Sequence, residues 1–369
     1  MTSLRRSNLK LIPWLQIPDN QDHLDVGFWA SGFLNIAAMR PILFATILLA
    51  IATSSSAQIV ESVGNRALGM GGAFVAVAAD STATWWNPAG MATGPFGDVS
   101  LGRAMTDLNE QIPARRDRVS WFAATAPAVG VSYYRLRITD IRGFAPTAQG
   151  SVNREDTRAE VSSRSISVSS WGLTVAQSIL PGVHAGATLK YVRGTARSGV
   201  DDATRAAGEL LDRGEDLEGG DAENRLDLDA GVIAAAGPVR IGAVMRNIRE
   251  PKFANAAFTL PRQTRAGAAL DLEKSGGPPL ILAIDVDVRT YVTGTGDRRV
   301  IAVGAEQWLA GKRIGVRAGA RFNRVGARER ATAAGVSIAA RNGLYLEGQI
   351  TRGGSDAERG WAFGSRFTF

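Results

Sequence analysis

The sequence predicts an all-β fold: a transmembrane antiparallel β-barrel of about 14 strands, preceded by an N-terminal plug segment. Apolar and polar residues alternate with period two from residue 96 onward, as in 280–289, where the even positions are apolar and the odd positions include Asp285 and Asp287. The candidate strands are roughly 10 residues long, and short turns alternate with mostly longer polar connections. A membrane barrel combines these features because one face of each strand meets lipid and the other faces the lumen.

The first 57 residues differ from the rest of the chain. A Met-Arg start precedes a twelve-residue apolar core, 41–52, and small residues then lead to a cleavage point after Ala57. This order predicts a signal peptide over 39–57 and export through the Sec pathway. Residues 1–38 are then an extension from a start codon assigned too early. A genuine N-terminal extension, or a signal anchor that uses the apolar residues just upstream, is the alternative.

Residues 58–95 precede the strands and contain a glycine-rich motif followed by an Asn-Pro step. The glycines permit close backbone packing, and Asn-Pro predicts a turn. The glycine spacing does not fit a dinucleotide or phosphate loop, because the six-residue fingerprint and the Lys-Ser/Thr pair are missing. We therefore expect this compact segment to fold into the lumen as a plug. Its defining residues are Arg66, Gly69, Gly71, Gly72, Asp80, Asn87, Pro88, Ala89 and Gly90.

The segment 96–369 contains fourteen candidate strands. They lie near 96–107, 118–126, 129–143, 160–179, 183–194, 224–236, 238–248, 262–274, 279–291, 298–310, 312–323, 329–340, 343–352 and 360–369. An even strand number places both ends of the barrel on the periplasmic side. In the strand at 160–179 the alternation loses its parity around Ser169 and Ser170, which indicates a bulge or two misjoined elements.

Aromatic side chains of a membrane barrel gather at its two interfaces. On this threading Tyr191, Tyr291, Phe322 and Trp361 lie near the outer rim, and Trp308, Phe367 and Phe369 lie near the inner rim. In the last strand Trp361, Phe363, Phe367 and Phe369 alternate with small or polar residues, and the sequence stops on Phe369. This pattern resembles the C-terminal aromatic signal that bacterial outer-membrane barrels present to their assembly machinery, which we therefore expect as a partner.

Charged residues of both signs occupy inward parity on many of the strands. They are Arg135, Arg137, Asp227, Asp229, Arg240, Arg246, Arg265, Asp271, Asp285, Asp287, Arg317, Arg321, Glu347 and Arg366, together with the polar His184. Such residues can form ion pairs that fill the lumen, or they can line a wet channel. Filling is favoured because a barrel of this size that carries a plug has little free bore. A soluble β-sandwich is the alternative fold, but its interior would not hold arginine at successive inward positions.

Two motifs ahead of the strands resemble a known family. Arg66-Ala-Leu-Gly-Met-Gly-Gly-Ala-Phe-Val-Ala-Val-Ala-Ala-Asp80 and Trp86-Asn-Pro-Ala-Gly-Met91 are similar to the N-terminal hatch of FadL/PorV-type outer-membrane barrels. The first motif is closer to the PorV-like branch than to the fatty-acid transporters. Shorter similarities occur at 227–231, 242–247, 260–267 and 304–308, so the resemblance covers 58–369. It implies a fourteen-stranded barrel with an N-terminal plug.

Three functions are open for such a barrel. The first is passive transport of small, hydrophobic solutes across the outer membrane. The second is a PorV-like, secretion-associated barrel that binds exported proteins or translocon components, and the third is a structural barrel without transport. The longest loop, 194–224, departs from the fatty-acid transporters because it is acidic rather than apolar. Its acidic residues are Asp201, Asp202, Glu209, Asp212, Glu215, Asp216, Glu218, Asp221 and Glu223.

Composition excludes several other classes of function. The chain has no cysteine, which removes disulfides, thiolate metal sites and cysteine nucleophiles. Its net charge of +7 comes from scattered Lys and Arg without a basic run, so nucleic acid is not expected as a partner. His184 is the only histidine after the leader, and paired histidines or carboxylates at ligand spacing are lacking. We therefore expect no enzyme, no metal site and no cofactor, and outer-membrane lipid as the surroundings in a Gram-negative envelope.

Overall fold

The computed structural model describes residues 56–57, 62–143, 160–254, 257–293, 296–326, 329–354 and 358–369. The expected extension 1–38 and signal peptide 39–57 lie outside these residues, except for Ser56 and Ala57. Those two residues form β1 (Ser56–Ala57), which pairs in parallel with β10 (Phe258–Thr259).

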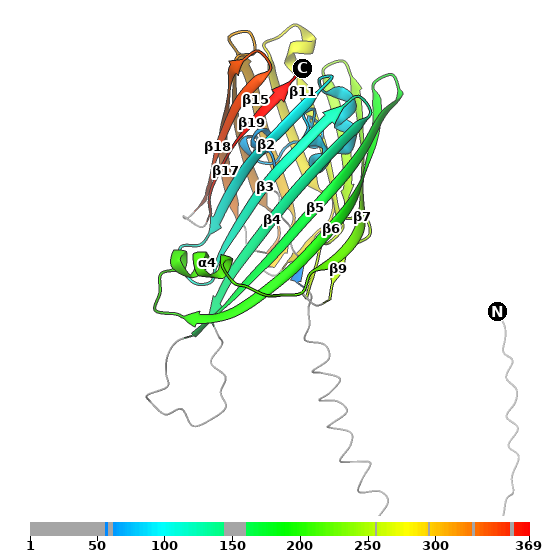
Figure 1. Ribbon diagram of the computed structural model, residues 1–369. Coiled ribbons are helices and arrows are strands. Elements are labelled where there is room, and N and C mark those ends of the chain that lie inside the picture. The colour runs from blue at the N-terminus through cyan, green and yellow to red at the C-terminus, as the bar shows by residue number, and fades with distance from the viewer. Residues whose placement is uncertain are drawn as a thin grey trace, which may run out of the picture. The chain divides into compact units, whose positions relative to one another are not determined.

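Fourteen antiparallel strands form a closed barrel, and Figure 1 shows how they tilt around it. In chain order they are β2 (Asp98–Leu108), β3 (Ala114–Ala126), β4 (Val129–Gly143), β5 (Glu160–Leu180), β6 (Val183–Asp202), β7 (Glu223–Ala236), β8 (Val239–Arg246), β11 (Gln263–Asp271), β12 (Leu280–Asp287), β15 (Val300–Leu309), β16 (Ile314–Asn323), β17 (Arg330–Arg341), β18 (Leu344–Gly353) and β19 (Glu358–Thr368). The last strand, β19, pairs with β2 and closes the barrel. The predicted all-β, fourteen-stranded barrel is confirmed.

The connections sort to the two ends of the barrel. One end, here called the short-turn end, carries the turns 127–128, 181–182, 237–238, 310–313 and 342–343, together with η2 (Leu272–Ser275). The start of β2 and the end of β19 lie there too. The other end, here called the loop end, carries α4 (Ala207–Glu215), β9 (Lys252–Phe253), β10 and the pair β13 (Tyr291–Thr293) and β14 (Gly296–Arg298).

The outward face of the strands is an exposed apolar belt. Leu173 on β5 pairs with Leu189 on β6, and their side chains are 52% and 53% exposed. Contiguous apolar surface of this kind is rare on soluble proteins and is expected where strands meet lipid. Aromatic residues on this face include Phe122, Trp171, Tyr191, Phe322, Trp361, Phe363, Phe367 and Phe369.

Two aromatic residues turn away from the outer surface, unlike the prediction. Trp308 faces the lumen, where its indole Nε1 donates a hydrogen bond to Glu306 Oε1 at 3.1 Å. Tyr291 is buried in the loop strand β13, and its hydroxyl accepts a hydrogen bond from the Thr264 amide at 2.6 Å. Both have a polar atom that requires a partner when it is buried, and lipid offers none.

Strand β5 is one continuous strand, so the predicted interruption at Ser169 and Ser170 was wrong. Both serines are paired on each side, and the register shifts only between Ser178 and Leu180. The apolar residues change faces instead: Ile166 and Val168 point inward, whereas Trp171 points outward and is 61% exposed. The loop end of the strand therefore has an apolar inner face and a polar outer face.

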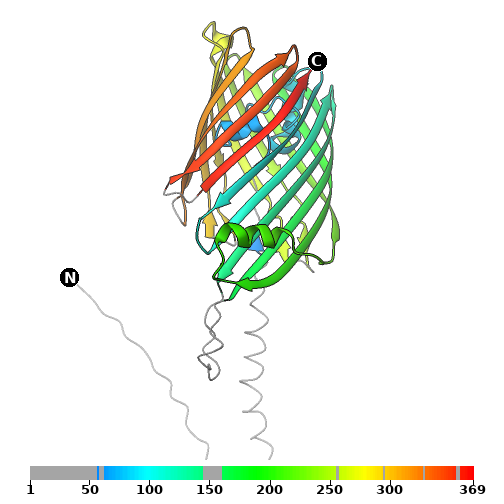
Figure 2. The same ribbon diagram turned by 60° about the vertical axis from the view of Figure 1, so that its left-hand side comes forward.

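Helix α4 lies on the outer face of β3 to β5 at the loop end (Figure 2). Leu210 and Leu211 of the helix pack against Ile141 and Val161 of the strands. Ion pairs flank this contact, with Arg116 at 2.5 Å from Asp212 and Arg118 at 2.6 Å from Glu215. Within the described residues, no helix is long and apolar enough to cross a bilayer.

A charge in the outward belt should destabilise the barrel in lipid. Ile284 lies in the middle of β12 on the outward face, and Ile284→Arg should lower the free energy of unfolding by about 2–4 kcal/mol in vesicles. Urea unfolding of the refolded protein measures this change. Val292→Arg, at an exposed position of the loop strand β13, is the matched control and should have little effect. An equal loss in both variants would contradict a lipid-facing belt.

Candidate functional site

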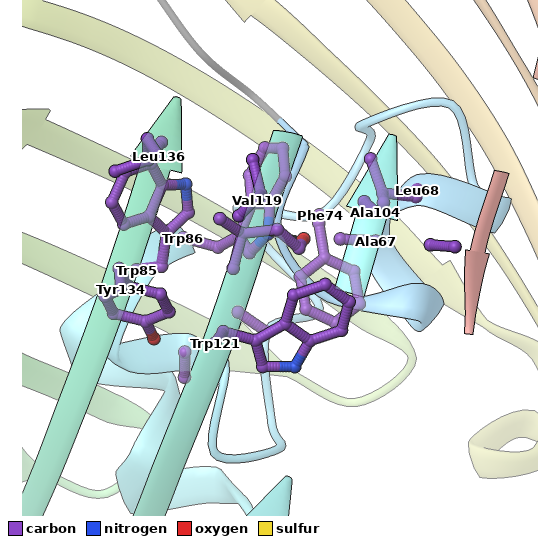
Figure 3. Packing of buried hydrophobic residues seen from close by; sticks show 14 of the residues in the cluster. Ala67, Leu68, Phe74, Trp85, Trp86, Ala104, Val119, Trp121, Tyr134 and Leu136 are labelled. Atoms are coloured by element: carbon purple, nitrogen blue, oxygen red, sulfur yellow. Dashed lines mark hydrogen bonds between the residues drawn. The ribbon is translucent and has the colours of Figure 1, made fainter. Parts of the chain in front are cut away.

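The residues 63–93 run through the inside of the barrel and are here called the lumenal segment. They contain α2 (Asn65–Gly69), α3 (Ala83–Trp86) and η1 (Pro88–Thr93). Helix α2 contacts β16 to β19, whereas η1 contacts β5 to β7, so the segment reaches opposite walls. Figure 3 shows its aromatic residues Phe74, Trp85 and Trp86 among side chains of β3 and β4.

The glycines of the motif permit close approach between the lumenal segment and the wall. Gly71 has a φ of +67°, and a Cβ atom there would lie 2.7 Å from the Ala320 amide nitrogen on β16. Gly90 lies even closer to its neighbour, because a Cβ atom would be 1.7 Å from the Ala78 carbonyl oxygen. Larger residues at either position would force the segment away from its present packing.

Asn87 joins two parts of the lumenal segment to the wall. Its Nδ2 donates to the Val75 carbonyl at 2.9 Å and to the Val232 carbonyl of β7 at 3.2 Å. Its Oδ1 accepts from the Ala89 amide at 3.2 Å, directly after Pro88. The side chain is fully buried, so this one residue ties the backbone of the segment to the backbone of the barrel by hydrogen bonds.

A buried carboxylate on β15 is the main ionic anchor of the lumenal segment. Glu306 accepts two hydrogen bonds from Arg66, from Nε at 2.6 Å and from Nη2 at 2.7 Å. Arg317 of β16 donates to the same carboxylate at 2.6 Å. Arg66 also lies 3.5 Å from Asp80, which in turn accepts from the Thr82 amide.

The ionic network continues along the neighbouring strands. Arg317 donates to the Ser337 hydroxyl at 2.7 Å, and that hydroxyl donates to Glu347 at 2.8 Å. Arg366 lies 3.3 Å from Glu347 and 3.5 Å from Asp98. Asp98 accepts from the Ser81 amide at 2.7 Å, which returns the network to the lumenal segment. The wall from β15 to β19 is therefore the ionic side of the lumen.

Other inward charges hold the segment or brace the wall. Asp285 accepts from the amides of Phe74 and Val75 at 2.8 and 2.9 Å. The guanidinium of Arg246 lies 3.9 Å from the centre of the Trp85 ring. Lys190 lies within 2.8 Å of Asp227 and Asp229, Arg265 lies 2.9 Å from Asp287, Arg240 lies 3.0 Å from Asp271, and Arg321 pairs with Glu358.

Arg135 and Arg137, which were predicted to line the lumen, lie on the outer face. Their neighbour Tyr134 points inward, where its ring lies 4.8 Å from that of Trp85. Adjacent residues of a strand point to opposite faces, so both arginines point outward. The prediction failed because Tyr133 and Tyr134 are both aromatic. Neither charge nor hydropathy therefore shows which residues of β4 face the lumen.

The other predicted inward residues do lie on the inner face, and parity could have identified further ones. Glu306, Lys190 and Asp98 have the same parity as inward residues of their strands, and the structure buries all three. Their network partners are distant in sequence, with 240 positions between Arg66 and Glu306. The alternation of a strand can show that Glu306 points inward, but it cannot show which arginine meets it.

The opposite side of the lumen is apolar. Side chains from three successive inward rows of β3 to β6 form this surface, here called the apolar wall: Val119, Trp121, Tyr134, Leu136, Ile138, Ile166, Val168 and Val192. Phe253 and Phe258 cover it toward the loop end, with their rings stacked 4.6 Å apart. Gly194 of β6 leaves room for Phe253, because a Cβ atom there would lie 2.5 Å from the ring.

Two cavities border the lumenal segment. One of about 340 Å³ opens at the short-turn end and is lined by Thr93, Gly182, His184, Ala235, Gly237, Arg240 and Lys274. There His184 Nδ1 lies 2.8 Å from the Ser178 hydroxyl. The other cavity, beside Arg66 and Asp80, measures about 10 Å³, which is space for roughly one water molecule. Groups of three or more His, Asp or Glu placed to hold a metal are absent from the described residues.

Comparison with known proteins gives a family and a fold. A family model described as "F plasmid transfer operon, TraF, protein" matches residues 85–287. No curated protein matches the chain. Among solved structures, the "CymD monoaromatic hydrocarbon channel" has a TM-score of 0.57 and 13% identity, over 84% of this chain and 98% of that one.

Two further solved structures have the same fold. The Pseudomonas putida toluene transporter TodX has a TM-score of 0.55 and 11% identity, over 84% of this chain and 99% of that one. A Pseudomonas aeruginosa FadL homologue has a TM-score of 0.56 and 8% identity, over 86% and 100%. At such identities the similarity establishes a FadL-type barrel fold.

Neutralising Glu306 should strongly destabilise the protein. Glu306→Gln leaves the buried guanidinium groups of Arg66 and Arg317 without their carboxylate, which should cost about 3–5 kcal/mol of unfolding free energy. Denaturant titration in lipid vesicles measures the loss. The exposed pair of Glu273 and Lys312 provides the control, since Glu273→Gln should change little; a small effect in both variants would show that the buried network is not an anchor.

Proposed function

The chain belongs to the family described as "F plasmid transfer operon, TraF, protein", and on this premise we propose that it is an outer-membrane barrel for passive passage of small hydrophobic solutes. The apolar wall is the observation that carries the proposal. It forms a continuous inward surface across four strands, in a lumen whose other side is ionic. A solute without polar groups would contact this wall without leaving buried charges unpaired.

The solved structures of the same fold support the class of solute. CymD is described as a monoaromatic hydrocarbon channel, and TodX as a toluene transporter. An aromatic hydrocarbon would fit a surface that offers Trp121 and Tyr134 for ring contacts and Leu136, Ile138 and Ile166 for apolar contacts. The PorV-like branch remains a prediction from the sequence motif.

In this proposal the lumenal segment is a plug, and the stacked phenylalanines close the loop-end mouth. Trp85, Trp86 and Phe74 occupy the centre of the barrel, and Phe253 with Phe258 covers the apolar wall above them. A solute would enter by displacing the two phenylalanines, which lie in a connection and not in the barrel sheet. It would leave toward the cavity at the short-turn end, beside His184.

The proposed orientation places the loop end outside the cell and the short-turn end in the periplasm. Short periplasmic turns and longer outer loops are typical of bacterial barrels. A signal peptide, the Sec pathway and recognition of Phe369 by the barrel assembly machinery belong to the same proposal. Phe363 and Phe367 are exposed on the outer face of β19, and Phe369 is exposed directly after it, where such machinery would meet them.

A structural barrel without transport is the second candidate. The ionic network favours it, because Arg66, Glu306, Arg317 and Glu347 join the lumenal segment to three strands by buried contacts. Such contacts resist the movement that passage requires. Transport is preferred because this network lies on the side of β15 to β19, whereas the residues of the apolar wall contact the lumenal segment through apolar side chains.

Removing the stacked phenylalanines should speed the entry of apolar solutes. Phe253→Ala with Phe258→Ala uncovers the apolar wall, so uptake of a hydrophobic fluorescent probe by cells should rise severalfold over the parent protein. Phe122→Ala with Phe322→Ala removes two aromatic rings from the outer face and should leave uptake unchanged. Equal uptake in all strains, including a deletion strain, would contradict transport; copurification of exported proteins would then favour the secretion-associated role.

Deleting the lumenal segment should open the barrel to ions. Removal of Gly64 to Ala92 should increase conductance in planar bilayers, because the remaining lumen is wide enough for water. Heat-modifiable gel migration checks that the barrel is still folded. A second variant, Arg66→Met, removes the segment's contact with Glu306 while Arg317 still pairs with that carboxylate, and it should conduct in brief openings. Folded variants with the parent's conductance would refute the plug.

A further inference from the structure

The outer face of β3 to β6 carries an aromatic row toward the loop end. Phe122, Tyr133, Trp171 and Tyr191 are paired in register across the four strands. One row nearer to the short-turn end, Val131, Leu173 and Leu189 are also in register and belong to the exposed apolar belt. Aromatic rows of this kind mark the level at which acyl chains give way to headgroups.

The next outward row toward the loop end is made of serine and arginine. Ser120, Arg135, Ser169 and Arg193 are paired in register across the same strands. The rows are two positions apart along each strand, so this row lies roughly 6–7 Å beyond the aromatic row. Arg135 and Arg193 flank Ser169 on either side, about 10 Å apart across the sheet.

A third row adds further positive charge. Arg118 lies directly opposite Arg137, an unfavourable placement of like charges in a sheet. Glu215 of α4 offsets it in part: its carboxylate lies 2.6 Å from Arg118, and its backbone carbonyl accepts from Arg137 at 3.3 Å. Arg137 also lies in the electrostatic field of Arg135 and Arg197. The arginines of these two rows therefore repel one another, and a bound anion would reduce this repulsion.

Arg135 and Arg193 have no such compensation within the part of the chain that the structure describes. Neither forms an ion pair there, and both side chains are exposed. Guanidinium groups bind phosphate through paired hydrogen bonds, and serine hydroxyls add further donors. Two free guanidinium groups around the Ser169 hydroxyl thus form a cradle of the right chemistry for a phosphate group.

We propose that Arg135, Ser169 and Arg193 bind the phosphorylated headgroup of a lipid in the membrane leaflet at the loop end. The lipid's acyl chains would lie along Trp171, Leu173 and Leu189, directly below the cradle. The position of the cradle favours a lipid over a soluble phosphate compound, because it adjoins the exposed apolar belt. The inference rests on the proposed membrane location.

Titration of the purified full-length protein with diphosphoryl lipid A in nonionic detergent tests the site, with native mass spectrometry as the readout. Arg135→Gln with Arg193→Gln should weaken binding by about tenfold or more, since each removes charge-assisted hydrogen bonds. Arg313→Gln with Arg341→Gln removes the same charge at the short-turn end and should leave binding unchanged. Lipid A freed of its phosphates should bind the parent as weakly as it binds the first variant.

Three results would overturn the inference. They are equal affinity of the two double variants, equal affinity for the dephosphorylated lipid, or inorganic phosphate that competes as strongly as the lipid does. A fourth measurement separates this site from the proposed function. Failure of the parent to insert into phosphatidylcholine vesicles would refute the membrane location, whereas normal insertion without a headgroup preference would refute only the lipid site.

Discussion

The buried carboxylate of Glu306 is the constraint on which the arrangement of the lumen depends. An ionised carboxylate that is removed from water requires cationic partners and hydrogen bonds. One partner, Arg317, lies on the adjacent strand. The bidentate partner is Arg66, near the start of the lumenal segment. The barrel wall therefore needs the segment to satisfy its charge. The segment likewise needs the wall, because Asp285 and Val232 accept hydrogen bonds from its buried donors.

This dependence divides the lumen into two sides with different tolerance for movement. On the ionic side, displacement of Arg66 would leave buried charges unpaired, and Glu347 and Arg366 would be disturbed in turn. On the apolar side, the contacts of Trp85 and Trp86 with the wall are mostly non-directional. Apolar contacts can be replaced by a solute of similar chemistry, whereas ion pairs cannot. Any passage through the barrel therefore belongs on the side of β3 to β6.

The strands could be predicted from sequence because period two is a local property. Each strand carries its own alternation, and all fourteen were recognisable without knowledge of their partners. The side of the wall on which Arg135 and Arg137 lie could not be predicted in this way, because it depends on which aromatic neighbour faces the lumen. The pairing of Arg66 with Glu306 was beyond reach for another reason: it joins residues that only barrel closure brings together. Local patterns thus define elements and faces, whereas the site arises from tertiary contacts.

Near Trp171 the apolar side chains of β5 change from the outer to the inner face. This change explains why the interruption predicted at Ser169 and Ser170 was wrong, and it relates the apolar wall to the arginine rows. Toward the short-turn end, β5 places its apolar residues outward, where Leu173 and Val175 are exposed. Toward the loop end, Ile166 and Val168 point inward, and serines take the outer face. Such a change is expected where the outer surroundings of a strand change from lipid to a polar environment, here water and helix α4. The same boundary therefore sets where the apolar wall begins inside and where the arginine rows begin outside.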